Sequence, residues 1–494
     1  MTLQDGMKIH IFLDSFVYKL GRVLSILVRV FRLSTRFLFM LAKAARLIGE
    51  LKLSPHRIDP AHAEICKKES DLPLVFCLSH SVPWPPRAGN EYRIHRMLSW
   101  LRGRGWDVVL LLCLLPGGEL NDAQISAVAA QYKNVIWIRR DGVLSYVAER
   151  SDVATAVASL AGRQVRDFAA ILGKRGADSS ERVLASLLET FCPDVLIETL
   201  ISLDNMLSPE ILLINYVLMA RGLSLLGSRA FKVIDTHDVF STKSRKVAAF
   251  GVDDGLGLAM STQDEANLLT TADLIIAIQC EEAEELRQIA PNMKVITVGV
   301  DMPIPPTDQK APERPIILLV ASGNPMNTKG LRDFLRFAWP RVIKAIPDAE
   351  LHVVGAVGAA LSGDELGVRW LGHVDDLGSV YAQARLIINP AVAGTGLKIK
   401  TLEALAYLRP IVLWPSGVDG MQPALRELCE CVTDWFAFTE AVIRLLCDDS
   451  ARQRLLLAKD QIAEMLSPNT VYDELEKVLR DRFSGPTVEH SAKA

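Results

Sequence analysis

The sequence predicts an α/β protein with two doubly wound domains, which follow a basic amphipathic helical segment. The 494 residues exceed the usual size of one hydrophobic core. From Asp71 onward, short apolar runs alternate with longer amphipathic stretches, a pattern typical of βαβ units. One proline-rich stretch interrupts this alternation. The predicted parts are an N-terminal segment (1–70), a first domain (71–300), a linker (301–315), a second domain (316–466) and a C-terminal helix with a polar tail (467–494).

The N-terminal segment is basic and amphipathic between residues 9 and 53, where eight lysines and arginines occur against two acidic residues. One helical stripe is formed by Arg22, Arg29, Arg36 and Lys43, which recur every seven positions. No apolar run reaches the roughly 18 residues that a membrane-spanning helix needs. We therefore expect a helix on a membrane surface, with its arginines facing anionic headgroups. The alternative is a helical hairpin that docks on the protein or on another subunit.

In the first domain, runs rich in Val, Ile and Leu are typical of strands buried on both faces of a parallel sheet. The stretches between them have helical character. The expected strands are 74–78, 107–115, 135–138, 194–200, 232–235, 274–278 and 295–298, and the expected helices include 91–103, 145–188 and 208–226.

The linker carries five prolines between Asp301 and Pro315, which indicates a semi-rigid connection between domains. After it, strands and helices alternate again, so a second doubly wound domain is expected. Its expected strands are 316–321, 350–354, 368–371, 386–389 and 410–414, and its expected helices are 330–345, 377–384 and 400–407.

The composition excludes several classes of protein. Half of the residues are hydrophobic and the net charge is only −3, so neither a disordered chain nor a nucleic-acid partner is expected. The eight cysteines lack repeated metal-ligand spacing, which favours reduced core thiols in a cytosolic protein. A metal site at Cys429 and Cys431 has no supporting histidine nearby. No secretory signal is expected at the N-terminus.

The stretch 389–415 has the strongest functional pattern. An apolar strand is followed by a glycine loop with two lysines, Lys398 and Lys400, and then by a helix. Unpaired amides and the dipole at a helix N-terminus favour phosphate, and the lysines add full charge. Glu403 has two interpretations: it compensates the helix dipole, or it accepts hydrogen bonds from a ribose diol.

Two further polar clusters follow predicted strands. Residues 322–330 form a loop and helix start, with Gly323 and Lys329, that is either a second phosphate contact or an ordinary polar turn. In the first domain, His237 and Asp238 follow a strand at the edge where open α/β sheets bind ligands. The histidine is a candidate for proton transfer or orientation, or else a capping residue.

These residues resemble a known family. The two domains, the proline-rich linker, the His-Asp pair after a middle strand and the sequences ADLIIAIQ and GTGLKIKTLEALAYLRPIV resemble GT-B glycosyltransferases of the group 1 or family 4 type. The resemblance covers roughly residues 72–446. It implies two Rossmann-like domains and transfer of a sugar from a nucleotide-sugar donor, with retention of configuration, no bound metal and no cofactor besides the donor substrate.

The resemblance also implies roles for individual residues. The candidate catalytic residues are His237, Lys398 and Glu403, with His237 near the transferred sugar and Glu403 on the ribose. The other donor-binding residues are Gly323, Lys329, Gly394, Thr395, Gly396 and Leu397, and the cleft is lined from the first domain by Gly89, Asn90, Arg93 and Asp238. One departure concerns Thr395, which stands where relatives carry the first of two glutamates separated by seven residues.

The sequence therefore predicts a glycosyltransferase of polysaccharide biosynthesis that extends a glycan or lipid-linked acceptor. We expect it in the cytoplasm, peripheral on the inner face of the membrane through residues 9–53. Two alternatives stay open. The chain is a non-catalytic homologue that acts as a binding or assembly partner, as Thr395 suggests, or it is a nucleotide-sugar epimerase.

Overall fold

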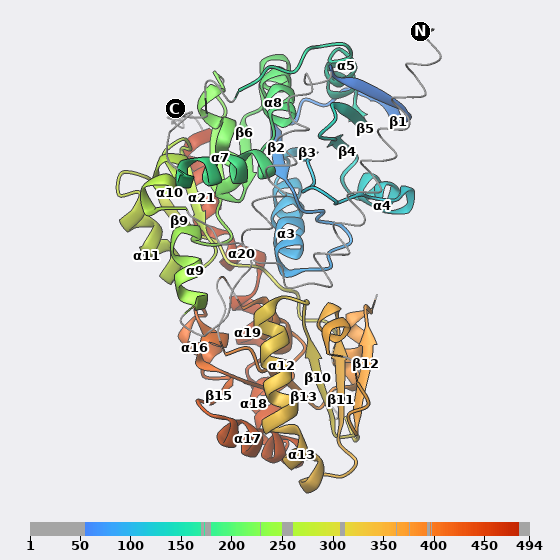
Figure 1. Cartoon of the computed structure of the whole chain (residues 1–494), viewed down its shortest axis with the longest axis vertical. Coiled ribbons are helices and arrows are strands. Elements are labelled where there is room, and N and C mark those ends of the chain that lie inside the picture. Colours follow the sequence, from blue (N-terminus) through green and yellow to red (C-terminus); the bar gives the residue numbers. More distant parts are fainter. Residues whose placement is uncertain are drawn as a thin grey trace, which may run out of the picture.

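The computed structural model describes residues 55–168, 172, 179–227, 229–248, 260–306, 312–361, 363–374, 376–392, 396 and 398–483. Within them the chain forms two α/β domains, each with a largely or wholly parallel sheet between helices (Figure 1). The predicted fold class is therefore confirmed. The basic segment 9–53, with its expected helix, lies outside the described residues. In the part of the chain that is described, no helix is both long and apolar enough to cross a membrane.

The first sheet has nine strands in the order β1-β5-β4-β3-β2-β6-β7-β8-β9. The pair β4–β5 is antiparallel, and the other described pairs are parallel. Because the central strands are covered on both faces, they are almost wholly apolar. The strands are β1 (Arg57–Lys68), β2 (Leu74–Ser79), β3 (Asp107–Leu112), β4 (Asn134–Ile138), β5 (Val143–Arg150), β6 (Ile211–Asn215), β7 (Phe231–Asp235), β8 (Leu274–Ala277) and β9 (Val295–Thr297).

Eight α-helices and one 3₁₀ helix accompany this sheet among the described residues. They are α3 (Gly89–Gly103), α4 (Asp122–Tyr132), α5 (Ser151–Ala158), α7 (Ser179–Phe191), α8 (Asp194–Leu207), η1 (Val217–Leu225), α9 (Phe240–Ala248), α10 (Thr262–Leu269) and α11 (Cys280–Ile289).

Four predictions of element type in this domain or just before it are wrong in whole or in part. The stretch 145–188 was expected to be helical, but residues 143–150 form β5. The stretch 208–226 was also expected to be helical, but it contains β6 and the 3₁₀ helix η1. A short apolar run buried on both faces has no periodicity that separates strand from helix. Residues 57–68 form β1 and pair with β5, so part of the N-terminal segment expected to be helical belongs to the first sheet.

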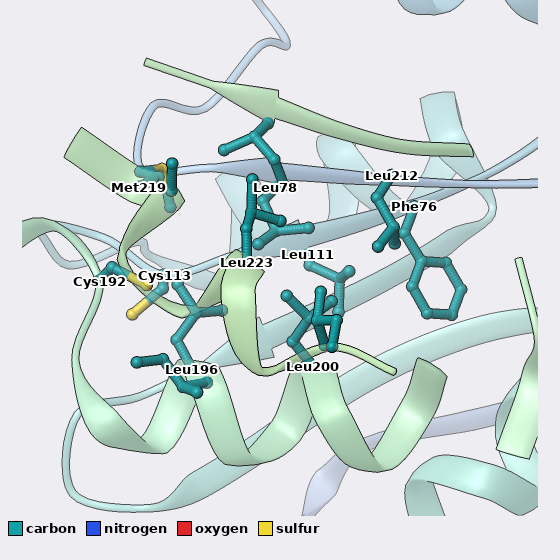
Figure 2. Close-up of a cluster of buried hydrophobic side chains, with 14 of the residues drawn as sticks. Phe76, Leu78, Leu111, Cys113, Cys192, Leu196, Leu200, Leu212, Met219 and Leu223 are labelled. Carbon is teal, nitrogen blue, oxygen red and sulfur yellow. The ribbon is translucent and has the colours of Figure 1, made fainter. Parts of the chain in front are cut away.

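The expected strand at 194–200 is helix α8. Pro193 precedes its first residue in an extended conformation, as an N-cap residue does. Leu196 and Leu200 are one turn apart and therefore face the same side of the helix. Figure 2 shows both side chains directed at the sheet, where they pack with residues such as Phe76 and Leu111. This packing buries Leu196 and Leu200 almost completely.

The second sheet has six parallel strands in the order β12-β11-β10-β13-β14-β15. Its strands and helices agree with the predicted alternation, with the long helix 330–345 divided into α12 and α13. The elements are β10 (Ile316–Val320), α12 (Pro325–Phe337), α13 (Trp339–Ala345), β11 (Glu350–Val354), η2 (Ala356–Ala360), β12 (Val368–Gly372), α14 (Leu377–Gln383), β13 (Leu386–Asn389), α15 (Ile399–Ala406), β14 (Ile411–Leu413), η3 (Pro415–Val418), α16 (Pro423–Arg426), β15 (Glu430–Cys431) and α17 (Trp435–Cys447).

The C-terminal helices lead from the second domain back to the first (Figure 1). They are α18 (Ser450–Leu457), α19 (Lys459–Met465), α20 (Pro468–Val471) and α21 (Asp473–Phe483). Leu475 and Leu479 of α21 are buried in a core cluster with residues of β2, β3 and α3. Just before α21, Tyr472 stacks on Trp100 of α3, with ring centroids 4.8 Å apart. The predicted C-terminal helix therefore exists, and it completes the core of the first domain.

The cysteines agree in part with the prediction of reduced core thiols. The seven whose side chains are described are free, without disulfides. Cys77, Cys113 and Cys192 are buried, while Cys280, Cys431 and Cys447 are exposed.

Candidate active site

The candidate site lies where loops of the two domains meet. In the first domain these loops follow β2, β7 and β8, and in the second domain they follow β13 and β14. Gly89 packs under Ile399 so closely that a Cβ on this glycine would lie 2.8 Å from the Ile399 Cδ1 atom. A Cβ on Gly420 would lie 2.3 Å from the Gln279 Oε1 atom. Ligands of open α/β sheets bind beyond the carboxyl ends of the strands, and this interface has that position.

The loop between β13 and α15, residues 390–398, is called the donor loop below. Gly396 has φ +71°, a left-handed conformation that glycine adopts without strain. Gly330 of α12 lets the start of the loop approach closely, because a Cβ there would lie 2.5 Å from the Pro390 carbonyl oxygen. Gly394, Thr395 and Leu397, which were predicted to bind the donor, lie outside the described residues.

Lys398 and Lys400 are both enclosed at the start of α15. The Lys398 Nζ atom donates to the Gly396 carbonyl oxygen at 2.8 Å, and burial lowers the pKa of this lysine against the opposing effect of nearby carboxylates. The Lys400 Nζ atom donates to Asn327 Oδ1 at 3.1 Å. Burial lowers the pKa of Lys400 to about 8, and Glu403 opposes the shift. With a pKa of about 8, Lys400 is mostly protonated near neutral pH.

The segment 322–330, which includes the start of α12, contacts the start of α15 through Asn327. The side-chain amide of Asn327 donates to the Ser322 carbonyl oxygen at 3.0 Å, and its Oδ1 accepts from Lys400. Gly323 is exposed on this loop. Lys329, predicted to contact phosphate, instead pairs with Asp333 of its own helix at 2.5 Å. The structure thus brings the loop and Lys400 together but directs Lys329 along α12.

Glu403 lies beyond the first turn of α15, where the helix dipole has little effect. Dipole compensation therefore does not explain this carboxylate. It accepts a hydrogen bond from the Tyr381 hydroxyl at 3.2 Å, and the Tyr381 ring stacks on Tyr407. Burial raises the pKa of Glu403 to about 6, although Tyr381 and Lys400 favour its charged form. Glu403 is thus a carboxylate of fixed orientation close to the partly buried Lys400.

His237 follows β7 and is buried against the donor loop. A Cβ on Gly396 would lie 3.3 Å from the His237 carbonyl oxygen. Burial lowers the pKa of His237 to about 4, so the ring is neutral near pH 7. The His237 Nε2 atom lies 3.0 Å from Asn215 Oδ1. Because the Asn215 amide nitrogen donates to the Leu78 carbonyl oxygen, its Oδ1 is an acceptor and the proton of His237 lies on Nε2.

The His237 backbone is in an unusual conformation, with φ +60°. Such a conformation is uncommon outside glycine, and histidine is among the residues that tolerate it best. The Tyr216 ring stacks on the imidazole at a centroid distance of 4.2 Å. The strand ends therefore hold this histidine in one orientation.

Arg93 was predicted to line the cleft, but it is buried, with 1% of its surface exposed. It forms an ion pair with Asp235 at 2.7 Å, and its Nη1 atom donates to the Val298 carbonyl oxygen at 2.7 Å. These contacts tie α3 to the ends of β7 and β9. Arg93 thus holds the strand ends behind the site in place, and its contacts are with these strand ends and not with the donor loop.

Asn90 and Asp238 lie closer to the interface between the domains than Arg93 does. The Asn90 amide donates to the Ser81 hydroxyl at 3.1 Å, next to the β2 end. One oxygen of Asp238 pairs with Lys243 at 2.6 Å. The other, Oδ1, lies 3.7 Å from the position of a Cβ on Gly396. The predicted residues His237, Asp238, Gly396 and Lys398 are thus brought together by the fold.

Glu282 is a site residue that sequence reasoning missed. It lies in the first turn of α11, is 4% exposed, and accepts a hydrogen bond from the Gly396 amide at 3.0 Å. Burial and the nearby Asp238 raise its pKa to about 7. The available signal was its spacing of four residues from the buried Leu286, which places it on the apolar side of the helix.

Among the residues that the structure describes, no group of three or more histidine, cysteine, aspartate or glutamate side chains is arranged to hold a metal ion.

Comparison with protein families identifies the second domain. Residues 314–448 match the family model described as glycosyl transferases group 1. The second domain is a group 1 glycosyl transferase domain. This match confirms the predicted family and the predicted class of enzyme, a glycosyltransferase. A comparison with curated protein sequences finds no match.

Solved structures with this architecture include several glycosyltransferases. Sucrose-phosphate synthase from Thermosynechococcus elongatus aligns with a TM-score of 0.58 at 14% identity, over 83% of this chain and 99% of its own. TarM from S. aureus, solved with UDP, aligns at 0.56 and 9% identity, over 82% and 99%. HepE from Anabaena, solved with UDP and glucose, aligns at 0.52 and 12% identity, over 83% and 100%. At these identities the likeness establishes the GT-B fold.

Proposed function

We propose that this glycosyltransferase moves a sugar from a nucleotide-sugar donor to a glycan or lipid-linked acceptor, with retention of configuration and without a bound metal. The proposal rests on the donor loop and the start of α15, where Lys398, Lys400 and Glu403 lie, and on the contact of Gly396 with His237 and Asp238 of the first domain. TarM and HepE, which have related folds, were solved in complex with UDP, so UDP is the first nucleotide to test. Retention and metal independence follow the family resemblance.

The proposed chemistry rests on stabilising a leaving nucleoside diphosphate. As the bond from the sugar to the diphosphate breaks, negative charge develops on the phosphate oxygens. Fixed cations in a water-poor site stabilise such charge more strongly than water does. In this proposal the charge comes from Lys398 and Lys400, two partly buried lysines at the start of α15. Both already have protein acceptors, so donor binding exchanges these hydrogen bonds for bonds to phosphate.

Glu403 is proposed to bind the ribose of the donor. An acidic residue in dinucleotide-binding folds accepts hydrogen bonds from ribose hydroxyls. The carboxylate of Glu403 is already oriented by Tyr381, which lowers the entropic cost of such binding.

Acceptor-dependent release of nucleotide tests the proposal. A thermal-shift screen of UDP, GDP and ADP with their sugars first selects the donor, because a ligand that binds the folded state raises its stability. Release of the nucleotide from that donor is then measured with candidate glycan and lipid-linked acceptors. We expect Lys398→Ala to lower kcat/KM by about a hundredfold or more. Lys344 is an exposed lysine on α13, so Lys344→Ala is the matched control and is expected to retain activity.

The same assay separates the two alternatives. Nucleotide release that requires an acceptor excludes an epimerase. A non-catalytic binding partner is favoured by one observation, namely that each described lysine at the donor loop has a protein acceptor. Unchanged behaviour of Lys398→Ala and Glu403→Ala with every donor would support that alternative and contradict sugar transfer.

We also propose that residues 9–53 hold the enzyme on the inner face of the cytoplasmic membrane. Support comes from the heptad spacing of basic residues in the sequence. Co-sedimentation with vesicles that contain anionic lipid tests this. The full chain is expected in the pellet and a chain without residues 1–53 in the supernatant, and equal sedimentation of both would contradict the proposal.

A further inference from the structure

Two carboxylates of the first domain flank Gly396 of the donor loop. The loop itself, residues 390–398, contains no acidic residue. The Glu282 Oε1 atom accepts from the Gly396 amide at 3.0 Å. The Asp238 Oδ1 atom lies 3.7 Å from the position that a Cβ on Gly396 would occupy. The two acidic groups beside Gly396 therefore come from α11 and from the turn after β7, while Asp419, which follows η3 in the second domain, acts on Lys398.

Each carboxylate keeps one oxygen without a partner. Glu282 Oε2 and Asp238 Oδ1 are both buried, and neither has a hydrogen-bond partner among the described residues. Glu282 as a whole is 4% exposed, so water does not compensate it. A buried carboxylate oxygen without a donor costs free energy that a bound donor group recovers. These two oxygens are therefore placed to accept hydrogen bonds from a ligand.

The charges around the pair indicate the chemistry of that ligand. Asp238 faces Glu282 from the turn after β7 and raises its pKa, while Lys246 of α9 and Lys398 of the donor loop oppose this effect. Two neighbouring carboxylates repel a phosphate group. A neutral group with several hydroxyl donors suits them better, because hydroxyl bonds to carboxylates are charge-assisted.

We propose that Glu282, together with Asp238, binds hydroxyl groups of the sugar carried by the nucleotide donor and so helps to select that sugar. The inference rests on the proposed function, since it concerns the sugar part of the same donor. Lys398, which is proposed to hold the diphosphate, is close enough to both carboxylates that they oppose the lowering of its pKa by burial. A site built to accept hydroxyl hydrogen bonds discriminates strongly against a sugar that lacks the hydroxyl.

Comparing a nucleotide sugar with its nucleotide tests this role. Calorimetry measures the affinities of UDP-glucose and UDP, with GDP-mannose and GDP as a second pair. Glu282→Gln is expected to weaken binding of the nucleotide sugar by about tenfold and to leave the affinity for the nucleotide within about twofold. Asp238→Asn is the second variant, with the same expected pattern. Glu284→Gln is the control, since Glu284 is exposed on the same helix.

A pH series gives a readout that a purely structural role would not change. The Glu282 pKa of about 7 means that this carboxyl gains a proton as the pH falls from about 8 to 6. The ratio of UDP-glucose affinity to UDP affinity should then fall over this range in the natural protein and stay flat in Glu282→Gln. Using the ratio removes the titration of the phosphates, which both ligands share.

The outcomes distinguish this inference from the proposed function. Equal weakening of both ligands by Glu282→Gln would overturn the inference and show that Glu282 only positions the loop. Stronger UDP binding in the variant would also overturn it, because Glu282 would then compete with phosphate for the Gly396 amide. If the natural protein binds none of the four ligands, the proposed function fails and this inference fails with it.

Discussion

Lys400 and Glu403 lie three residues apart on α15, and each affects the charge of the other. Burial lowers the pKa of Lys400 to about 8, and the Glu403 carboxylate limits this shift. Replacing Glu403 by glutamine removes that negative charge, so the pKa of Lys400 should fall further. Because only protonated Lys400 attracts phosphate, UDP binding by Glu403→Gln should decline at a lower pH than in the natural protein. Calorimetric titrations with UDP between about pH 6.5 and 9.5 measure this difference.

Lys400→Arg provides the control for this prediction. Arginine stays protonated over the whole range, so the decline of UDP affinity at alkaline pH should disappear. Identical pH profiles for Glu403→Gln and the natural protein would contradict the proposed coupling.

At the residue level, the sequence identified the donor loop but not all of its partners. His237, Asp238 and Lys398 could be predicted because each follows a strand or begins a helix of a recognisable pattern. The prediction that Arg93 lines the cleft is wrong because Arg93 pairs with Asp235, which is 142 positions away in the chain. Glu282 was missed because it reaches the site only through packing of one domain on the other. The Arg93 contact leaves no local signal in the sequence, and the spacing of Glu282 from Leu286 indicates burial but not the contact with Gly396.

The close packing of α12 on the donor loop gives a prediction about an element. Alanine is usually favoured over glycine inside a helix by about 1 kcal/mol. At position 330, however, a Cβ would lie 2.5 Å from the Pro390 carbonyl oxygen, which is backbone that cannot easily move. Gly330→Ala should therefore lower the free energy of unfolding by about 1–3 kcal/mol, as overpacking does. Urea denaturation measures the change.

Gly103→Ala is the matched control for this substitution. Gly103 ends α3, and a Cβ there would meet nothing within 4 Å. We expect this variant to be neutral or more stable by up to about 1 kcal/mol. If both variants were equally stable, the contact between α12 and the donor loop would not be as tight as the structure indicates.

Element types were predicted well in the second domain and less well in the first. Most strands of the second domain are short apolar runs followed by a turn and an amphipathic helix, so the alternation is visible. In the first domain, α8 is buried on nearly every side, so its apolar residues do not follow a helical stripe. A short buried helix of this kind resembles a strand in sequence, and β6 resembled a helix for the same reason. Only tertiary packing separates the two.

On the scale of the whole molecule, the two domains are connected both by the linker and by the C-terminal segment that returns to the first domain. Asp301 begins the linker, and its carboxylate pairs with Arg96 of α3 and accepts from the Tyr472 hydroxyl at 2.8 Å. The segment after the second domain thus returns to the start of the linker and to the first domain. The sequence predicted a helix after residue 467, but its docking site could not be predicted, because an amphipathic helix fits any apolar face.

The return of α21 to the first domain predicts where a mutation in it acts. Leu475 is 3% exposed and belongs to the core cluster that includes Val75 of β2 and Val108 of β3. Leu475→Ala should lower the free energy of unfolding by about 2–5 kcal/mol through loss of burial and a cavity. Hydrogen exchange should then speed up at amides of β2 and β3, about 400 residues earlier in the chain. Leu457→Ala, at a side chain that is 88% exposed, should change stability by no more than about 0.5 kcal/mol. Faster exchange in α21 alone, with β2 and β3 unaffected, would mean that this helix only rests on the first domain and does not complete its core.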